Sequence, residues 1–162
     1  MGVSKLITSA LAGQTAAEFA AVGDKCAQFR QYDRAIEAYR KATTRIPLGT
    51  EASGIYAADV HVAIGNALLG RAEVAHSQGE GSGQVQRMQL EAAEEFRQAV
   101  QINERHCEAH YNLGTLLYAL GDIAGAESHL LSAVSWNHDF VAARINLAVV
   151  FAEQGEGAAA KV

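Results

Sequence analysis

The sequence predicts an all-α fold in which helical hairpins stack side by side as a solenoid. Three observations predict it: apolar residues recur at spacings of three and four, the chain contains a single proline, and the sequence matches itself with a 34-residue period. A fixed period of this size is typical of stacked units that each bury an apolar face against the next unit. We therefore expect about three hairpins followed by a terminal half repeat.

The composition is that of a folded protein with a sizeable core. Of the 162 residues, 49% are hydrophobic and 19% are charged, and the formal net charge is -5. This length predicts a single domain, residues 1–162. The sequence has no basic stretch that could follow a phosphate backbone, so we expect no nucleic-acid partner. A basic or neutral protein surface suits the charge of the chain better.

The cysteines and the N-terminal segment indicate an intracellular, cytoplasmic protein. Cys26 and Cys107 are too few and too far apart to indicate a disulfide scaffold, and we interpret them as reduced thiols. The N-terminal segment, residues 1–15, has too weak an apolar run for a secretory signal or a membrane span. Gly2 matches the start of a myristoylation site, but Leu6 stands where that motif requires Ser or Thr. We expect no membrane association.

Small and large residues at fixed offsets make up the 34-residue period. One set of six residues is Asn112, Leu113, Gly114, Leu117, Gly121 and Ala126, and it recurs as Asn146, Leu147, Ala148, Phe151, Gly155 and Ala160. One period earlier, Ala126, Leu130 and Ala133 correspond to Ala92, Phe96 and Ala99. Near the start the spacing is complete in Phe19, Val22, Gly23, Cys26, Ala35, Tyr39, Ala42 and the closing Pro47.

This pattern resembles the tetratricopeptide repeat family. In that family an aromatic residue, Leu-Gly and a large residue on a first helix precede alanine, an aromatic residue and alanine on a second. A generic helical bundle predicts no such fixed recurrence. The resemblance implies a right-handed α-solenoid that binds proteins or peptides. The chain departs from the family at His110 and Arg144, where tryptophan is preferred, and at His138, which replaces the closing proline.

The first hairpin is predicted over residues 16–49 and the third over residues 107–140. A glycine inside a helix costs about 1 kcal/mol relative to alanine. We therefore expect Gly23 and Gly114 to lie where the neighbouring helix approaches closely. The large side chains that fill the space between the paired helices are then Tyr39, Phe96 and Leu130, flanked by alanines.

The second hairpin, residues 50–106, is predicted to be elongated. Ala35 and the matching Ala92 are 57 residues apart (92 − 35), which exceeds one period of 34 by 23, so the second unit contains an insertion. Apolar residues recur at helical spacing across residues 51–77 without a proline. This favours one first helix about 40 Å long.

Glycines leave an alternative open for this hairpin. A break at Gly65 or Gly70 would give two shorter helices instead of one. The sequence GEGSG, residues 79–83, predicts a flexible turn, and an elongated second helix is predicted to begin at Gln84.

The terminal half repeat, residues 141–162, is predicted to expose apolar side chains. Its first helix is predicted over residues 141–154, and the chain stops where a second helix should begin. Terminal repeats normally need a polar outer face for solubility. Either a longer array continues here, or another copy or another protein covers the strip. We expect Val150 and Phe151 to mediate such assembly, so a homo-oligomer or a larger complex is an alternative role.

The resemblance implies that the first helices line the concave surface of the array. The positions that it gives are Glu108, Tyr111, Asn112, Thr115 and Tyr118 in the third unit, Ala142, Ile145, Asn146 and Val149 in the last, and Ala17, Ala20, Asp24 and Gln28 in the first. In the family, an asparagine at the position of Asn112 and Asn146 often binds the backbone of an extended peptide. An amide side chain suits this role because it can donate a hydrogen bond to a C=O group and accept one from an N–H group. The alternative is a solvated asparagine or one bonded within the array. We interpret Tyr111 and Tyr118 as contact surface rather than core.

A subset of the family binds the C-terminal carboxylates of chaperones through lysine, arginine and asparagine side chains. The corresponding positions here hold Ala20 and Asp24 in the first unit and Glu108 and Asn112 in the third. A negative charge repels a carboxylate, so a co-chaperone-type adaptor is disfavoured.

The sequence carries little that indicates catalysis. His106, Cys107 and His110, with the distant His76 or His129, lack a fourth metal ligand at a recognised spacing, so we expect no metal. There is no phosphate-binding glycine loop and no nucleophile motif, so we expect no cofactor and no enzyme. The predicted function is a protein-interaction scaffold that binds a protein or peptide segment in its concave groove.

Overall fold

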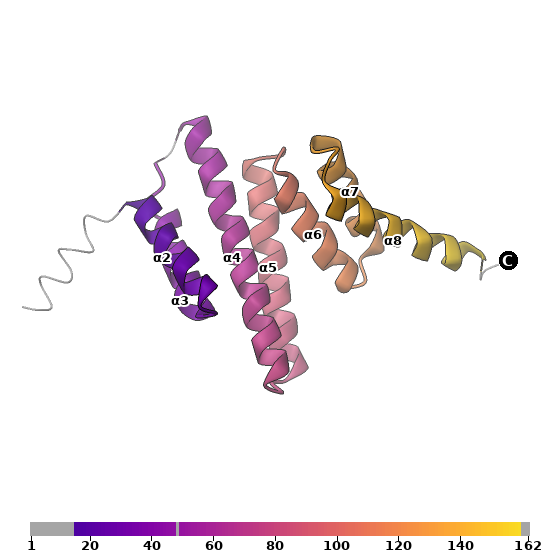
Figure 1. Ribbon diagram of the computed structural model, residues 1–162, viewed down its shortest axis with the longest axis horizontal. Helices are drawn as coiled ribbons and strands as arrows, with labels where there is room; N and C mark the ends of the chain where they lie inside the picture. The colour runs from indigo at the N-terminus through magenta and orange to yellow at the C-terminus, as the bar shows by residue number, and fades with distance from the viewer. Residues whose placement is uncertain (1–14, 48, 160–162) are drawn as a thin grey trace, which may run out of the picture.

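The computed structural model describes residues 15–47 and 49–159 of the chain (Figure 1). This part contains helices and no strand, which confirms the all-α fold. The helices are α2 Ala16–Gln28, α3 Tyr32–Thr43, α4 Glu51–Ser77, α5 Ser82–Ile102, α6 Cys107–Ala119, α7 Ile123–Trp136 and α8 Val141–Ala159. The interpretation of Gly2 and Leu6, and the recurrence at Ala160, lie outside the described residues.

The helices pair into hairpins that follow one another across the molecule (Figure 1). Each helix packs against the next one in the chain, and the first helices α2, α4, α6 and α8 also contact one another in sequence. The surface formed by these four first helices is called the inner face below. The second helices α3, α5 and α7 form the other layer.

Side-chain caps fix where several helices begin. Thr15 and Glu18 form a capping box at α2, in which the Thr15 N–H donates to Glu18 Oε2 at 2.7 Å. Thr50 and Ser53 form the same arrangement at α4. Asp122 Oδ1 accepts the N–H of Gly125 at 2.9 Å at the start of α7. These caps satisfy backbone donors that would otherwise lack partners.

A glycine on the first helix closes each hairpin against a large side chain on the second. A Cβ added to Gly114 would lie 2.8 Å from Cγ of Leu130 and 3.1 Å from the carbonyl oxygen of Ala126. Gly23 lies in the same way against the ring of Tyr39. The flanking alanines are fully buried, namely Ala35, Ala42, Ala92, Ala99, Ala126 and Ala133. The close approach predicted for Gly23 and Gly114 is therefore confirmed.

Helix α4 is continuous, so the alternative of a break at Gly65 or Gly70 is wrong. Both glycines instead accept close contacts: a Cβ on Gly65 would lie 2.8 Å from Cζ of Phe96, and one on Gly70 would lie 2.5 Å from the ring of Tyr32. In the elongated hairpin, Gly65 therefore allows the two helices to approach closely, as Gly23 and Gly114 do in theirs. After Gly65, α4 continues to Ser77, whereas α6 ends at Ala119 soon after Gly114, so α4 runs about two turns further past its glycine.

The far end of the elongated hairpin has a small core of its own. Ala72 and Ala75 of α4 pack on Met88 of α5, with Val85 beside them. Figure 1 shows this end projecting beyond the neighbouring hairpins. Helix α5 begins at Ser82, with Gly81 as its N-cap, so it starts earlier than the predicted Gln84 and the turn is shorter.

Helix α8 differs from its prediction in two respects. It continues through Gly155 to Ala159, whereas the equivalent Gly121 has a φ of 86° and ends its helix. The prediction that Val150 belongs to an exposed strip is wrong, because Val150 is only 1% exposed and joins the core. Val150 stands one period after the buried Leu116, at a position that packs against the preceding hairpin.

Candidate protein-interaction surface

A hollow lies on the inner face between α6 and α8. It measures about 140 Å³ and is lined by Thr115, Tyr118, Leu130, Asn146 and Val149. All of these except Leu130 are predicted site residues. Leu130 belongs to α7 and reaches the hollow because its side chain fills the gap opposite Gly114. A mainly apolar hollow with a few polar groups can hold one aliphatic side chain and fix the backbone beside it.

The predicted asparagines bond across neighbouring first helices. Asn112 Nδ2 donates to Asn66 Oδ1 at 3.0 Å, and Asn146 Nδ2 donates to Thr115 Oγ1 at 2.9 Å. One amide N–H of each is therefore used within the array, as the alternative interpretation expects. Each side chain retains a second N–H. Asn66 was not predicted, although it follows Gly65 as Thr115 follows Gly114.

Other predicted residues differ in their environment. Tyr111 is half-buried and packs on Phe140 with ring centroids 4.8 Å apart, so it is more a packing residue than the free contact surface that we expected. Glu108 and Ile145 lie on first helices at the inner face. The Tyr39 hydroxyl donates to Asp24 Oδ1 at 2.8 Å. Burial raises the pKa of Tyr39, and this hydrogen bond raises it further.

Carboxylates recur along the inner face. His106 Nδ1 accepts the N–H of Ala109, so Nε2 carries the proton and donates to Asp59 at 2.9 Å. Burial raises the pKa of Tyr56, and the charges of Asp24 and Asp59 raise it further.

The α6–α8 end of the inner face also carries acidic side chains. Glu108 is exposed in the first turn of α6. A hydrogen bond to Glu153 raises the pKa of Tyr118, so a carboxylate of α8 lies beside the hollow. Negative charge is thus present on all four first helices.

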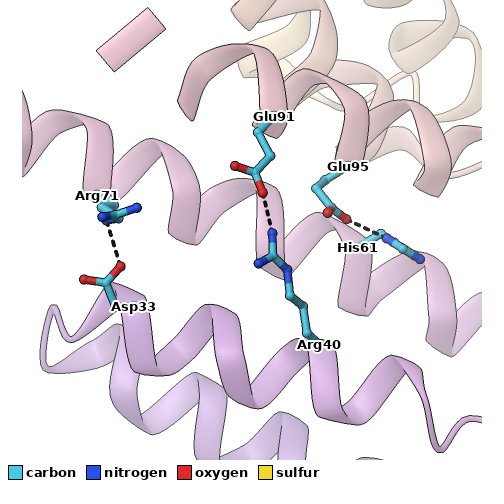
Figure 2. Close-up of polar contacts among 6 residues, drawn as sticks. All are labelled: Asp33, Arg40, His61, Arg71, Glu91 and Glu95. Atoms are coloured by element: carbon cyan, nitrogen blue, oxygen red, sulfur yellow. Dashed lines mark hydrogen bonds and ion pairs between the residues drawn. The ribbon is translucent and has the colours of Figure 1, made fainter. Parts of the chain in front are cut away.

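Basic side chains gather instead between α3 and the elongated hairpin (Figure 2). Arg40 of α3 pairs with Glu91 of α5, and Arg71 of α4 pairs with Asp33 of α3 at 2.8 Å. A second hollow of about 380 Å³ lies here, and its charged lining residues carry both signs: Asp33, Glu37, Arg40, Lys41, Arg71 and Glu91. On this side of the molecule, Arg40 and Arg71 therefore form ion pairs with carboxylates.

Comparison with known proteins identifies the repeat. Residues 108–131 and 141–162 match the tetratricopeptide repeat family. The first tetratricopeptide domain of Spaghetti (RPAP3), solved with the HSP90 peptide SRMEEVD, is 17% identical with a TM-score of 0.67, over 88% of this chain and 94% of that one. These two segments are therefore tetratricopeptide repeats, and the chain has the fold of a tetratricopeptide repeat domain.

Two further solved structures are similar to this chain. The Arabidopsis OM64 domain is 13% identical with a TM-score of 0.65, over 86% of this chain and 96% of that one. MamA is 15% identical with a TM-score of 0.68, over 94% of this chain and 74% of that one. At these identities the likeness shows the shared helical-repeat fold. No curated protein matches the chain in sequence.

The histidines and the cysteine considered for a metal take other positions in the repeat. His106 caps α6, whereas His110 is buried between the Glu104 carbonyl at 3.1 Å and His129 Nδ1 at 3.0 Å. Within residues 15–47 and 49–159, no group of three or more His, Cys, Asp or Glu side chains is placed to hold a metal ion. In the same part of the chain, no helix has the length and apolar character needed to cross a membrane.

The histidine pair predicts a loss of stability in acid. Burial lowers the pKa of both His110 and His129 below the ordinary value of 6.5. As the pH falls below that value, the unfolded chain takes up protons before the folded chain does, so the free energy of unfolding decreases. Urea unfolding at about pH 7.5 and about pH 5.5 measures this decrease.

A variant isolates the contribution of the pair. His129→Gln keeps an N–H donor for His110 but does not titrate, so its stability should fall less between the two pH values. An equal fall in the parent and the variant would contradict this account of the buried pair.

Proposed function

We propose that the chain is a non-enzymatic protein-interaction scaffold that binds an extended segment of a partner on its inner face. The hollow between α6 and α8 carries this proposal, because residues of two successive first helices converge on it. The bound peptide in the Spaghetti structure supports the same use of the fold. The proposal takes the whole chain as one cytoplasmic domain without a cofactor, with repeats over 16–49, 50–106 and 107–140 and a half repeat over 141–162.

In this proposal the asparagines have two tasks. The bonds from Asn112 to Asn66 and from Asn146 to Thr115 keep the first helices in register. The second N–H of each amide donates to a carbonyl group of the bound segment. The side chain of the segment next to that carbonyl enters the hollow between Leu130 and Val149.

Filling the hollow tests the proposal. The immobilised chain is used to select binders from a display library of random short peptides, and selected peptides are then measured by fluorescence anisotropy. We expect Val149→Phe to weaken binding at least tenfold, because the larger side chain occupies the space of the anchor. Val141→Phe is the matched control, since Val141 is exposed in the same helix but does not line the hollow. Equal loss in both variants, or no selected peptides, would contradict the proposal.

The acidic inner face disfavours a co-chaperone-type adaptor. The peptide in the Spaghetti structure, SRMEEVD, contains carboxylate side chains. Here Asp24 and Glu108 are exposed carboxylates on the face where such a peptide would bind. We therefore propose a partner of different charge.

Assembly through α8 is a second candidate function. Ile145 is 58% exposed and Phe151 is 46% exposed, and they lie in the last described helix of the array. Phe151 stands one period after Leu117, which is buried in the core. Light scattering across a concentration series should show a rising mass that Phe151→Ser abolishes. A constant monomer mass would remove this candidate.

A further inference from the structure

We propose that the segment bound on the inner face is cationic, with lysine or arginine side chains on either side of one aliphatic anchor. This inference rests on the proposed function and adds the chemistry of the partner. It follows from how charge is divided between the two layers of the array, together with the size and lining of the hollow.

The inner face presents carboxylates along its length. Asp24 lies on α2, Asp59 on α4, Glu108 on α6, and Glu153 on α8 beside Tyr118. Asp24 accepts a hydrogen bond from the hydroxyl of Tyr39, and Asp59 accepts one from the Nε2–H of His106. The His106 imidazole is neutral in this arrangement, because its Nδ1 accepts the N–H of Ala109. Neither carboxylate is therefore neutralised by a lysine or arginine in these contacts, and both leave negative charge at the face.

The basic residues of the first helices do not lie among the carboxylates of the inner face. Lys25 is exposed and occupies the place, within its repeat, of Leu116 and Val150, which join the core rather than the inner face. Arg71 reaches Asp33 of α3. Arg144 is exposed and occupies the place of His110, whose side chain faces His129 of α7 rather than the inner face.

Several cations of the second layer pair with carboxylates of the same layer. Arg40 pairs with Glu91, and Lys41 pairs with Glu37 at 2.5 Å. The larger hollow of about 380 Å³ therefore presents paired charges of both signs, whereas the inner face presents carboxylates. A cationic segment is attracted to the inner face and gains less from the second layer.

The hollow sets the register of the segment. Its volume of about 140 Å³ and its contacts from Leu130 and Val149 suit one aliphatic side chain. Glu153 lies one helical turn beyond Val149, so a basic residue close to the anchor can reach its carboxylate. Basic residues further along the segment then meet Glu108 and Asp59.

The charge of selected peptides tests the inference. In the same display selection, we expect enriched sequences to carry net positive charge around a Leu, Ile, Val or Met. If the peptides whose binding is weakened by Val149→Phe are neutral or acidic, the cationic inference is overturned while the proposed function stands. If no peptide depends on Val149, the proposed function is overturned and the inference with it.

Matched variants separate specific pairing from the overall charge of the chain. For one enriched peptide, Glu108→Gln and Glu153→Gln should each weaken binding about two- to fivefold, as expected for exposed charge pairs. Glu37→Gln changes the net charge equally but lies on α3, so it should leave affinity within error. A loss in Glu37→Gln equal to that in the inner-face variants would overturn the inference, because attraction would then be general.

Discussion

Gly65→Ala should lower the free energy of unfolding by about 2 kcal/mol, the typical cost of overpacking a core. The added Cβ would lie 2.8 Å from Cδ1 and Cζ of Phe96, a distance that real Cβ atoms essentially never show. Phe96 is fully buried, so its ring cannot turn into solvent to relieve the contact. Urea unfolding followed by circular dichroism measures the change.

The matched control for this substitution lies in the same helix. Gly54→Ala places its Cβ 3.8 Å from Ile102, an ordinary contact distance. It should stabilise α4 by roughly 0.5–1 kcal/mol, because alanine loses less backbone entropy than glycine on folding. If Gly65→Ala were as stable as Gly54→Ala, the close approach of α4 and α5 would not be what closes the hairpin.

Leu130→Ala is expected to cost about 2–5 kcal/mol, the range for removing a buried leucine side chain. Leu130 is 0% exposed and contributes both to the core of the third hairpin and to the wall of the hollow. The adjacent Leu131 is 45% exposed, so Leu131→Ala should change stability by less than about 0.5 kcal/mol. Similar losses in the two variants would contradict the assignment of the core face of α7.

The sequence predicted the hairpins because their contacts repeat at a fixed spacing. Gly23 and Gly114 stand out through the 34-residue period, and each lies against the large residue expected to fill the gap. Gly65 was missed because the insertion in the second hairpin displaces it from that period. Gly65 can instead be recognised from its surroundings, because it is a glycine inside a long helix whose other residues favour helix. It also lies opposite an aromatic residue, Phe96, on the second helix of the hairpin.

The candidate site was predictable in outline only. The offsets gave Thr115, Tyr118, Asn146 and Val149 of the hollow, because residues one period apart occupy equivalent places on neighbouring helices. They could not give Leu130, which reaches the hollow from the second layer past Gly114. Val150 was misplaced because an apolar residue near the end of an array was taken as exposed, although its repeat position packs it against the preceding hairpin.

The central claim, that partner segments bind on the inner face, is tested most directly by an NMR titration of the labelled chain with a selected peptide. We expect amide shifts to change over residues 111–118 of α6 and 145–153 of α8, around the hollow. Changes confined to α3 and α5, near Arg40 and Glu91, would place binding on the second layer and contradict the claim.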